Sequence, residues 1–569
     1  MKTKFTLFFC LCFASFQLQS QIFDWAFALG GDVQDEGRAV ATDNSGNIYT
    51  AGLFRYITDF DPEDGVFELT ANGAASDVFI QKTDAEGHFV WAIHFGSENF
   101  DEVHGLAIDA AGDILVVGHF NGTADFDPDS TNAYNLTSAG GDDVYVAKFH
   151  NDGALVWAKN MGGLTTDEGH AVAVDSDNNV IIGGRFQGVA DFDPGNQTFN
   201  LTANGGGDDF FICKLDATGN FIWALGTGDN SNDHCIGVTT DNSGNVIATG
   251  YYYGVTDFDP GAGENLLTAI GAIDIFIAKY NAAGLPLWVK SFGSVGWEVG
   301  YAVQTDVDGN IYATGRFENT VDFDSGSGTN EITAMGEQDI YLLKLNADGS
   351  TAWAHGFGSA LPEWGQSIDL DNNSNIYLTG FYQSTIDFNP GAAQNNLTSA
   401  GGEDVFICKY DLNGNHIWSQ TVGGTDASFG DRGQSIAVDN SGNVYTTGWF
   451  YGTADLNPEA DVLSINSHGN FDAFLIKTHP IPADVESDHM HHFIQIYPNP
   501  TSDFVQIVFD QTIPNAHIEI FNATGQMIET QNLLSTKTAI IPLSGPKGIY
   551  FIRLKDYAGI ETKFKVIKE

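Results

Sequence analysis

The chain has 569 residues, of which 66 are Gly; 12% are aromatic and only 17% are charged. This composition favours short aromatic-rich strands joined by tight turns, and the hydrophobic content of 43% excludes a globally disordered chain. The 23 Lys and Arg against 74 Asp and Glu give a net charge of −51, which makes nucleic acid and anionic membrane surfaces poor partners. Cations, neutral glycans and other proteins remain as candidate partners.

The first 20 residues have the pattern of a secretory signal peptide. Lys2 and Lys4 precede an apolar run from Phe5 to Phe16, and Ser20 supplies a small residue at the cleavage point. This run is too short to span a bilayer, and the sequence predicts no transmembrane segment elsewhere. We therefore expect export, with residues 1–20 removed.

Residues 21–478 repeat with a period of 65 or 66 residues. Two elements, Asp-Phe-Asp-Pro or a close variant and Asp-x-aromatic-aliphatic-x-Lys, each recur seven times. Each repeat reads as four short strands separated by Gly and Asn turns, which is typical of a β-propeller blade. The sequence thus predicts an all-β chain with a seven-bladed propeller. Tryptophan marks the repeats at Trp25, Trp91, Trp157, Trp223, Trp288, Trp353 and Trp418.

The phase of the repeats predicts that the propeller is closed. The mature chain would begin with a fourth-strand sequence, Phe23–Gly31, that has no third strand before it. The last repeat ends with a third strand, Asp472–Lys477, that has no fourth strand after it. Pairing these two segments would complete the last blade and leave no open edge.

The composition changes after Thr478. Residues 479–492 read as a polar linker, and residues 493–569 contain short alternating strands in which seven acidic residues balance seven basic ones. We predict that residues 493–569 form a separate, small Ig-like β-sandwich.

Both parts resemble known families. The patterns GxAVAxDxxGNxYxxG and DxFIxKxDxxGxxxWA, readable in nearly every repeat, resemble the secreted bacterial SBBP-type β-propeller repeats, which implies an exported propeller but no particular reaction. In the C-terminal part, YPNP (Tyr497–Pro500), LSGPKGIYFIRL (Leu543–Leu554) and the basic tail (Lys563–Lys568) resemble the type A sorting domain of the type IX secretion system. That resemblance implies Sec export, recognition of residues 493–569 by the type IX machinery, and removal of this domain with release or surface attachment.

Acidic residues recur in fixed columns. The column that ends the first strand, from Asp43 onward, stands beside Asn-Ser-Gly-like sequences and is interpreted as turn caps. The Asp-Phe-Asp-Pro elements place two carboxylates on one side of a strand, where they repel unless donors or a cation neutralise them. Oxygen ligands suit Ca²⁺, so a Ca²⁺ site and a plain turn both remain open. The carboxylates concerned are Asp59, Asp61, Asp125, Asp127, Asp191, Asp193, Asp257, Asp259, Asp322 and Asp324.

Positions that depart from the repeat are the best candidates for a binding site, because a site needs a distinctive set of side chains. The loop before each first strand varies most, and its mixture of aromatic, His and acidic residues suits a glycan. The predicted binding residues are Glu36, Glu102, Glu168, His234, Trp297, Trp364 and Arg432. A second variable column follows two positions later, at Arg38, His104, His170, Ile236, Tyr301, Gln366 and Gln434.

The sequence predicts a secreted, non-enzymatic β-propeller that acts in binding or adhesion at the cell surface or outside the cell. It contains no Ser-His-Asp elbow, HExxH, Gly-rich phosphate loop or CxxC. A propeller glycoside hydrolase or polysaccharide lyase acting on extracellular glycans is the alternative, since the repeats supply too many carboxylates to single out a catalytic pair. If the first strand of each repeat is innermost, the variable loops and the Asp-Phe-Asp-Pro connections share one face, which we predict to be the binding face.

Overall fold

The computed structural model describes residues 21–63, 65–259, 261, 263–427, 429–459, 462–480, 494–497, 501, 504–522, 527–543, 546–556 and 561–568. The predicted signal peptide and most of the predicted linker lie outside the described residues. The chain divides into two compact parts, Met1–Pro480 and Ile481–Glu569. All regular structure in the described ranges is β-strand, and no helix there is long and apolar enough to cross a membrane.

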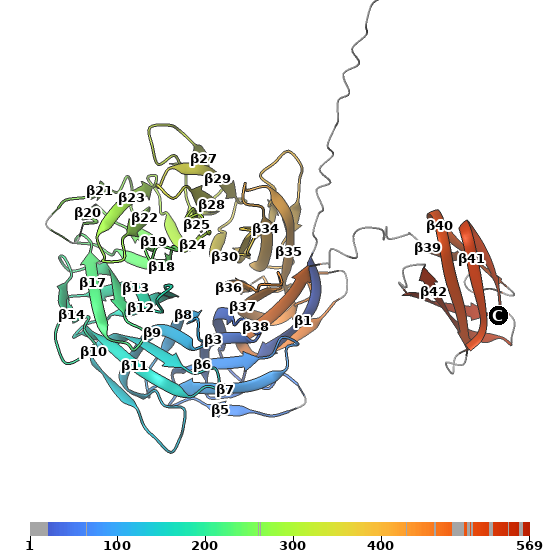
Figure 1. Ribbon diagram of the computed structural model, residues 1–569, viewed down its shortest axis with the longest axis horizontal. Coiled ribbons are helices and arrows are strands. Elements are labelled where there is room, and N and C mark those ends of the chain that lie inside the picture. Colours follow the sequence, from blue (N-terminus) through green and yellow to red (C-terminus); the bar gives the residue numbers. More distant parts are fainter. Residues whose placement is uncertain are drawn as a thin grey trace, which may run out of the picture. The chain divides into compact units, whose positions relative to one another are not determined.

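The N-terminal part contains seven repeats of four antiparallel strands, which surround a common centre (Figure 1). The first strands are innermost: β2 (Glu36–Thr42), β8 (Glu102–Ile108), β12 (Glu168–Val174), β18 (His234–Thr240), β24 (Val299–Thr305), β30 (Trp364–Leu370) and β36 (Arg432–Val438). The second strands are β3 (Ile48–Arg55), β9 (Ile114–Asp125), β13 (Val180–Gln187), β19 (Val246–Tyr252), β25 (Ile311–Phe317), β31 (Ile376–Tyr382) and β37 (Val444–Asp455).

The outer half of each repeat is made by its third and fourth strands. The third strands are β6 (Ser76–Thr83), β10 (Asn135–Phe149), β16 (Asp208–Leu215), β22 (Asp274–Tyr280), β28 (Asp339–Leu345), β34 (Asp404–Tyr410) and β38 (Ser464–Pro480). The fourth strands are β7 (Phe89–Phe95), β11 (Leu155–Gly163), β17 (Phe221–Thr227), β23 (Pro286–Phe292), β29 (Thr351–Phe357), β35 (His416–Gly424) and β1 (Gln21–Leu29).

Short hairpins extend the connection between the second and third strands. They are β4 (Ile57–Asp59) with β5 (Glu68–Thr70), β14 (Val189–Asp191) with β15 (Asn200–Thr202), β20 (Val255–Asp257) with β21 (Leu266–Thr268), β26 (Thr320–Asp322) with β27 (Glu331–Thr333), and β32 (Thr385–Asp387) with β33 (Asn396–Thr398). In repeats 2 and 7 the long strands β9, β10, β37 and β38 include the same hairpin.

The burial of each strand follows from its place in the repeat. Strands β3 and β6 are buried along almost their whole length, because neighbouring repeats cover both faces, whereas β7 at the outside is only partly buried. The turn after each first strand is capped by its Asp: Asp43 Oδ1 accepts the backbone N–H groups of Ser45 at 2.8 Å and Asn47 at 3.0 Å. Gly46 in this turn has a φ of 83°, which favours glycine. These contacts confirm the predicted turn caps.

Strand β1 pairs antiparallel with β38, with Trp25 opposite Lys477 and Leu29 opposite Ala473. The predicted pairing of the first and last segments is therefore confirmed. The pairing continues to Gln21 opposite Pro480. Residues 479 and 480, which the sequence analysis assigned to the linker, are thus part of β38.

The C-terminal part is also all-β. Its five strands form one hydrogen-bonded sheet, in which β40 pairs with β39, β41 and β42, and β42 pairs with β43. The register of β40 shifts between Val508 and Ile513, yet Ile507 and Ile518 from its two halves are buried in the same core. An Ig-like sandwich of two separate sheets remains a prediction. The strands are β39 (Ile494–Tyr497), β40 (Phe504–Asn522), β41 (Met527–Pro542), β42 (Gly548–Asp556) and β43 (Glu561–Lys568).

Candidate functional site

Each innermost strand carries a β-bulge at the same place. In β2 the pairing with β3 shifts between Gly37 and Ala39, so that Arg38 is the extra residue, and the other six innermost strands shift at the equivalent position. In a regular strand, side chains alternate between the two faces of the sheet, and a bulge re-aims the side chain of the extra residue out of this alternation. The seven extra residues line one central cavity of about 320 Å³: Arg38, His104, His170, Ile236, Tyr301, Gln366 and Gln434.

The residue that begins each innermost strand lies just before this bulge and pairs across the hairpin with a residue of the second strand. Six of the seven predicted binding residues occupy this position. Their partners form a third variable column that the sequence analysis missed, although each partner directly follows a repeated Gly such as Gly118 or Gly448. The pairs are Glu36–Leu53, Glu102–His119, Glu168–Arg185, His234–Tyr251, Val299–Arg316, Trp364–Phe381 and Arg432–Trp449.

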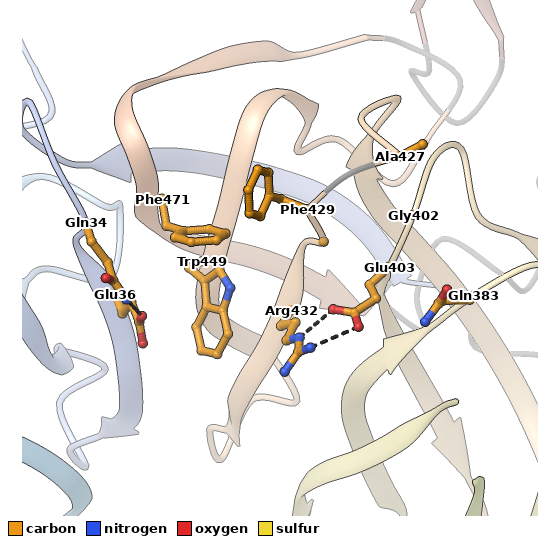
Figure 2. A pocket seen from close by; sticks show the side chains of 11 residues that line it. Gln34, Glu36, Gln383, Gly402, Glu403, Ala427, Phe429, Arg432, Trp449 and Phe471 are labelled. Atoms are coloured by element: carbon orange, nitrogen blue, oxygen red, sulfur yellow. Dashed lines mark hydrogen bonds and ion pairs between the residues drawn. The ribbon is translucent and has the colours of Figure 1, made fainter. Parts of the chain in front are cut away.

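On the side of repeats 6, 7 and 1, these positions border a cavity of about 450 Å³ (Figure 2). The Arg432 guanidinium donates hydrogen bonds to both carboxylate oxygens of Glu403, at 2.5 and 2.9 Å. Its carbon lies 4.3 Å from the centre of the Phe381 ring and 5.5 Å from that of the Trp364 ring. The cation is therefore held between a carboxylate and aromatic faces.

Aromatic side chains form one wall of this cavity. Phe429, half of whose surface is exposed, lies with its ring centre 4.6 Å from that of Tyr451 and 5.8 Å from that of Phe471. The Phe471 ring centre is in turn 6.4 Å from that of Trp449. Phe429 arrives on an insertion, because Asp431 follows Asp404 by 27 residues whereas Glu363 follows Asp339 by 24. Gln34, Glu36 and Gln383 complete the polar part of the lining.

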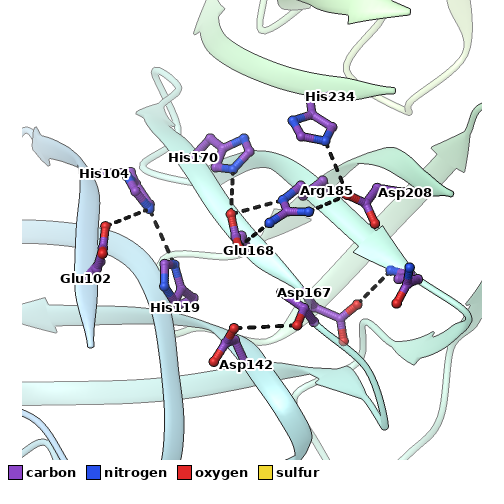
Figure 3. Close-up of polar contacts among 12 residues, drawn as sticks. Glu102, His104, His119, Asp142, Asp167, Glu168, His170, Arg185, Asp208 and His234 are labelled. Atoms are coloured by element: carbon purple, nitrogen blue, oxygen red, sulfur yellow. Dashed lines mark hydrogen bonds and ion pairs between the residues drawn. The ribbon is translucent and has the colours of Figure 1, made fainter. Parts of the chain in front are cut away.

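On the side of repeats 2 to 4, the same positions carry histidines and ion pairs (Figure 3). Arg185 bridges Glu168 and Asp208, and His170 Nε2 lies 3.2 Å from Glu168. Burial opposes the charge of Glu168, but the hydrogen bonds from His170 and Arg185 prevail and lower the pKa of Glu168. Burial lowers the pKa of His234 to about 4, so its imidazole is neutral at pH 7.

Two predicted residues, Trp364 and Trp297, have different surroundings, although neither is among the described residues that line the two cavities. Trp364 Nε1 donates to Gln338 at 2.8 Å, and the Arg316 guanidinium carbon lies 4.2 Å from the centre of its ring. Trp297 is 49% exposed, and among the described residues it lines neither the central cavity nor the cavity of Figure 2. Its prediction rested on a position near the variable loop in sequence.

The Asp-Phe-Asp-Pro carboxylates accept hydrogen bonds from the backbone of their own loops. Asp59 Oδ1 accepts the N–H groups of Asp61 at 3.1 Å and Phe67 at 2.8 Å, and the first Asp of each later pair accepts two equivalent bonds. This geometry is that of a turn cap. A Ca²⁺ ion at these carboxylates stays a prediction. Thr58 beside them donates to Asp35 Oδ1 at 3.2 Å, so the two loop sets lie on one face, as expected.

Comparison with known families agrees with both resemblances. Residues 417–449 match the family model described as a β-propeller repeat, and residues 495–569 match the one described as a secretion system C-terminal sorting domain. The chain therefore carries β-propeller repeats and a type IX sorting domain, and it is exported to the cell surface or outside the cell.

Two curated proteins are similar to parts of the chain. The uncharacterized WD repeat-containing protein L264 of Acanthamoeba polyphaga mimivirus is 25% identical over 449 residues, which cover 65% of this chain and 31% of that protein. The regulatory protein FlaEY of Caulobacter vibrioides is 23% identical over 245 residues, which cover 41% of this chain and 24% of that protein. The chain thus spans less than a third of the length of either relative.

Removal of residues 493–569 should stop export at the periplasm and leave the N-terminal part folded, because the two parts are separately compact and the sorting domain lies entirely in the second. Immunoblots of periplasm, outer membrane and culture medium should show that nearly all of the truncated protein is periplasmic. A full-length chain with Phe199→Ala, a change far from the sorting domain in sequence, is the control. Equal amounts of truncated and full-length protein outside the cell would contradict this prediction.

Proposed function

We propose that the seven repeats act as one closed seven-bladed propeller that binds neutral glycans outside the cell, in the cavity lined by Phe429, Trp449 and Arg432. The pairing of β1 with β38 supports closure, as does the central cavity, to which every innermost strand contributes a residue. Closing a sheet into a ring removes the edges at which chains aggregate, which suits a protein exported from the cell.

The composition of the cavity in Figure 2 is the observation that carries this proposal. Aromatic rings offer apolar faces against which the C–H faces of a sugar ring can pack, and Gln34, Gln383 and Glu36 offer donors and acceptors for its hydroxyl groups. A chain with a net charge of −51 repels polyanions, so among glycans a neutral one is favoured over an anionic one.

Binding without hydrolysis is favoured by the state of the carboxylates in this cavity. Glu403 is held on both oxygens by Arg432, and Glu36 Oε2 lies 2.8 Å from Arg38. A carboxylate whose oxygens are engaged by a guanidinium is not free to act on a glycosidic bond, whereas glycoside hydrolysis needs two carboxyl groups that reach that bond. The hydrolase or lyase alternative would be detected as reducing ends or unsaturated products released in the binding assay.

Phe429→Ala and Trp449→Ala should each weaken glycan binding at least about tenfold. Each removes an aromatic ring against which a sugar can pack, and the loss of about 1.4 kcal/mol of binding free energy lowers affinity tenfold. The measurement is calorimetric titration with laminarin, xylan, mannan and chitooligosaccharides, with polygalacturonate as the anionic comparison. Phe199→Ala removes an aromatic ring of similar exposure outside the cavity and should leave affinity unchanged. The proposal fails if no neutral glycan binds, or if the Phe429 variant binds as tightly as the parent.

A further inference from the structure

In repeat 2, three side chains of the types that bind metal ions lie close together beside the central cavity. Glu102 begins β8, His104 is the extra residue of the bulge in β8, and His119 on β9 is the cross-strand partner of Glu102. The three side chains therefore converge from the same hairpin, as Figure 3 shows. No other repeat has three such donors at these positions: repeat 3 has Arg185 in place of the second histidine, and repeat 1 has Leu53.

The separations of the donor atoms fit a small tetrahedral site. His104 Nε2 lies 3.4 Å from His119 Nδ1 and 3.9 Å from Glu102 Oε2, and one donor from each of the three residues lies within 4.8 Å of the others. A tetrahedral Zn²⁺ site, with nitrogen and oxygen ligands at about 2.0–2.1 Å, places neighbouring donors about 3.4 Å apart. Only small side-chain movements would bring the three donors onto one ion.

Further side chains surround the two imidazoles. The ring centre of His104 lies 5.3 Å from that of His119 and 5.6 Å from that of His170. His119 is buried and also belongs to a second group, with Asp142 and Glu168, whose donors lie within 4.8 Å of one another. A carboxylate beside a ligating imidazole typically orients its ring.

One nearby charge acts against a bound cation. The Arg38 guanidinium lies 3.6 Å from Glu102 Oε2 and 2.8 Å from Glu36 Oε2. It competes for the Glu102 carboxylate and repels a metal ion, so removal of this charge should increase metal affinity.

We propose that Glu102, His104 and His119 form a binding site for one first-row divalent transition-metal ion, of which Zn²⁺ is the probe of choice. Two imidazoles and one carboxylate are typical ligands of Zn²⁺ sites that keep a fourth position open. His104 also lines the central cavity, from which water or a polar group of a ligand could reach a fourth position. The proposal does not depend on glycan binding in the cavity of Figure 2.

The test compares Zn²⁺ binding to the full-length protein with binding to two ligand variants, His104→Ala and Glu102→Gln, after treatment with EDTA and dialysis. Calorimetric titration should give about one equivalent that is lost in His104→Ala and weakened at least about tenfold in Glu102→Gln. Circular dichroism and thermal melts establish that each variant is folded. Co²⁺ substitution should give the visible absorption of a four-coordinate site in the parent and not in the His104 variant.

Two further variants distinguish this site from other histidine groups. His88→Ala removes an exposed His beside Asp84 and Glu86. This variant should still bind the one equivalent of Zn²⁺ that His104→Ala loses. Arg38→Gln should tighten Zn²⁺ binding several-fold, an effect that a merely structural role for these residues would not produce. The predicted linker contains three further histidines, His489, His491 and His492, which are present in the parent and in every variant. The readout is therefore the difference in Zn²⁺ binding between parent and variant. Identical stoichiometry and affinity in the parent and the His104 variant would overturn the proposal.

Discussion

A chain without residues 23–31 is expected to unfold about 10 °C or more below the full-length protein, or to fail to fold, because this deletion exposes the edge of β38. In β1, Leu29 is 2% exposed, and Trp25, Phe27 and Phe23 pack against the cores of repeats 7 and 1. Loss of these contacts costs on the order of 5 kcal/mol or more, from about 1.5–3 kcal/mol per buried large side chain. Thermal unfolding followed by circular dichroism measures the change.

A transplanted strand separates the effect of pairing from that of chain shortening. In every other repeat the fourth strand follows the third directly, as β35 follows β34 through residues 411–415. Insertion of the sequence of residues 21–31 after Pro480, through a copy of that loop, should restore much of the stability lost in the deletion. An unchanged unfolding temperature in the deletion variant would contradict the pairing.

A milder change keeps the prediction testable if the deletion variant does not fold. Leu29→Ala should destabilise the protein by about 2–5 kcal/mol, the range for truncation of a buried Leu. Val90→Ala on β7, where the side chain is 46% exposed, is the matched control and should cost much less. Equal effects of the two substitutions would show that β1 contributes no more than an exposed strand.

The repeat markers predicted the strands well because each marker has a local physical role. The Asp43 column caps a turn, the repeated Gly residues allow φ above zero, and the apolar runs match strands buried on both faces. The binding residues could be found only in part. Six of the predicted seven begin an innermost strand, but their partners, such as His119 and Trp449, depend on a register that the bulge shifts by one residue.

The cavity of Figure 2 was beyond prediction for a different reason. It exists because an insertion of three residues before Asp431 carries Phe429 to the face of Tyr451 and Phe471, and the conformation of an inserted loop has no repeat to define it. The three-residue insertion itself can be read from the sequence, but the cavity that it forms cannot. In contrast, the proposed metal ligands of repeat 2 all come from the three variable columns. They could have been recognised once the pairing of β8 with β9 was known.

Seven buried carboxyl groups predict an unusual dependence of stability on pH. They form the column before the first strands, and each lies near the buried Asp at the start of a third strand, as Asp233 lies near Asp209. Burial raises the pKa of these groups to about 6 for Asp431, to about 8 for Glu363 and to about 7 for Asp35, Asp101, Asp167, Asp233 and Glu298.

The sign of the pH effect follows from the direction of these shifts. With these pKa values the folded state releases the seven protons between about pH 6 and 8, whereas the unfolded chain releases them near pH 4. Their contribution to the free energy of unfolding is therefore complete below pH 4 and is lost as the pH rises through about 7. His234, whose pKa is lowered to about 4, acts in the opposite direction between about pH 4 and 6.5. The lowered pKa values of His104, His355 and His416 act in the same direction as that of His234.

Ionisation of all seven groups together would exceed the stability of a typical protein. One group with a pKa raised by about three units costs about 4 kcal/mol when it is ionised in the folded state, and total stability is usually about 5–15 kcal/mol. In EDTA, where no divalent cation can neutralise these carboxylates, we expect the unfolding temperature to fall steadily from pH 5 to pH 8. Turn-capping Asp residues such as Asp216, whose pKa hydrogen bonds lower to about 2, do not titrate in this window.

A single substitution should reduce this pH dependence. Asp209 Oδ2 accepts hydrogen bonds from Asn204, and its buried Oδ1 has no hydrogen-bond partner among the described residues. Asp209 Oδ1 and Asp233 Oδ2 both lie close to Gly228. Asp209→Asn would keep the accepting oxygen and turn an N–H donor toward Asp233, so it should raise the unfolding temperature at pH 8 and leave it nearly unchanged at pH 5. Asp216→Asn, which weakens a turn cap, should lower it at both pH values. An unfolding temperature that rises between pH 5 and pH 8 in the parent, or an Asp209 variant that is less stable at pH 8, would show that these carboxyl groups are ionised and satisfied in the folded protein.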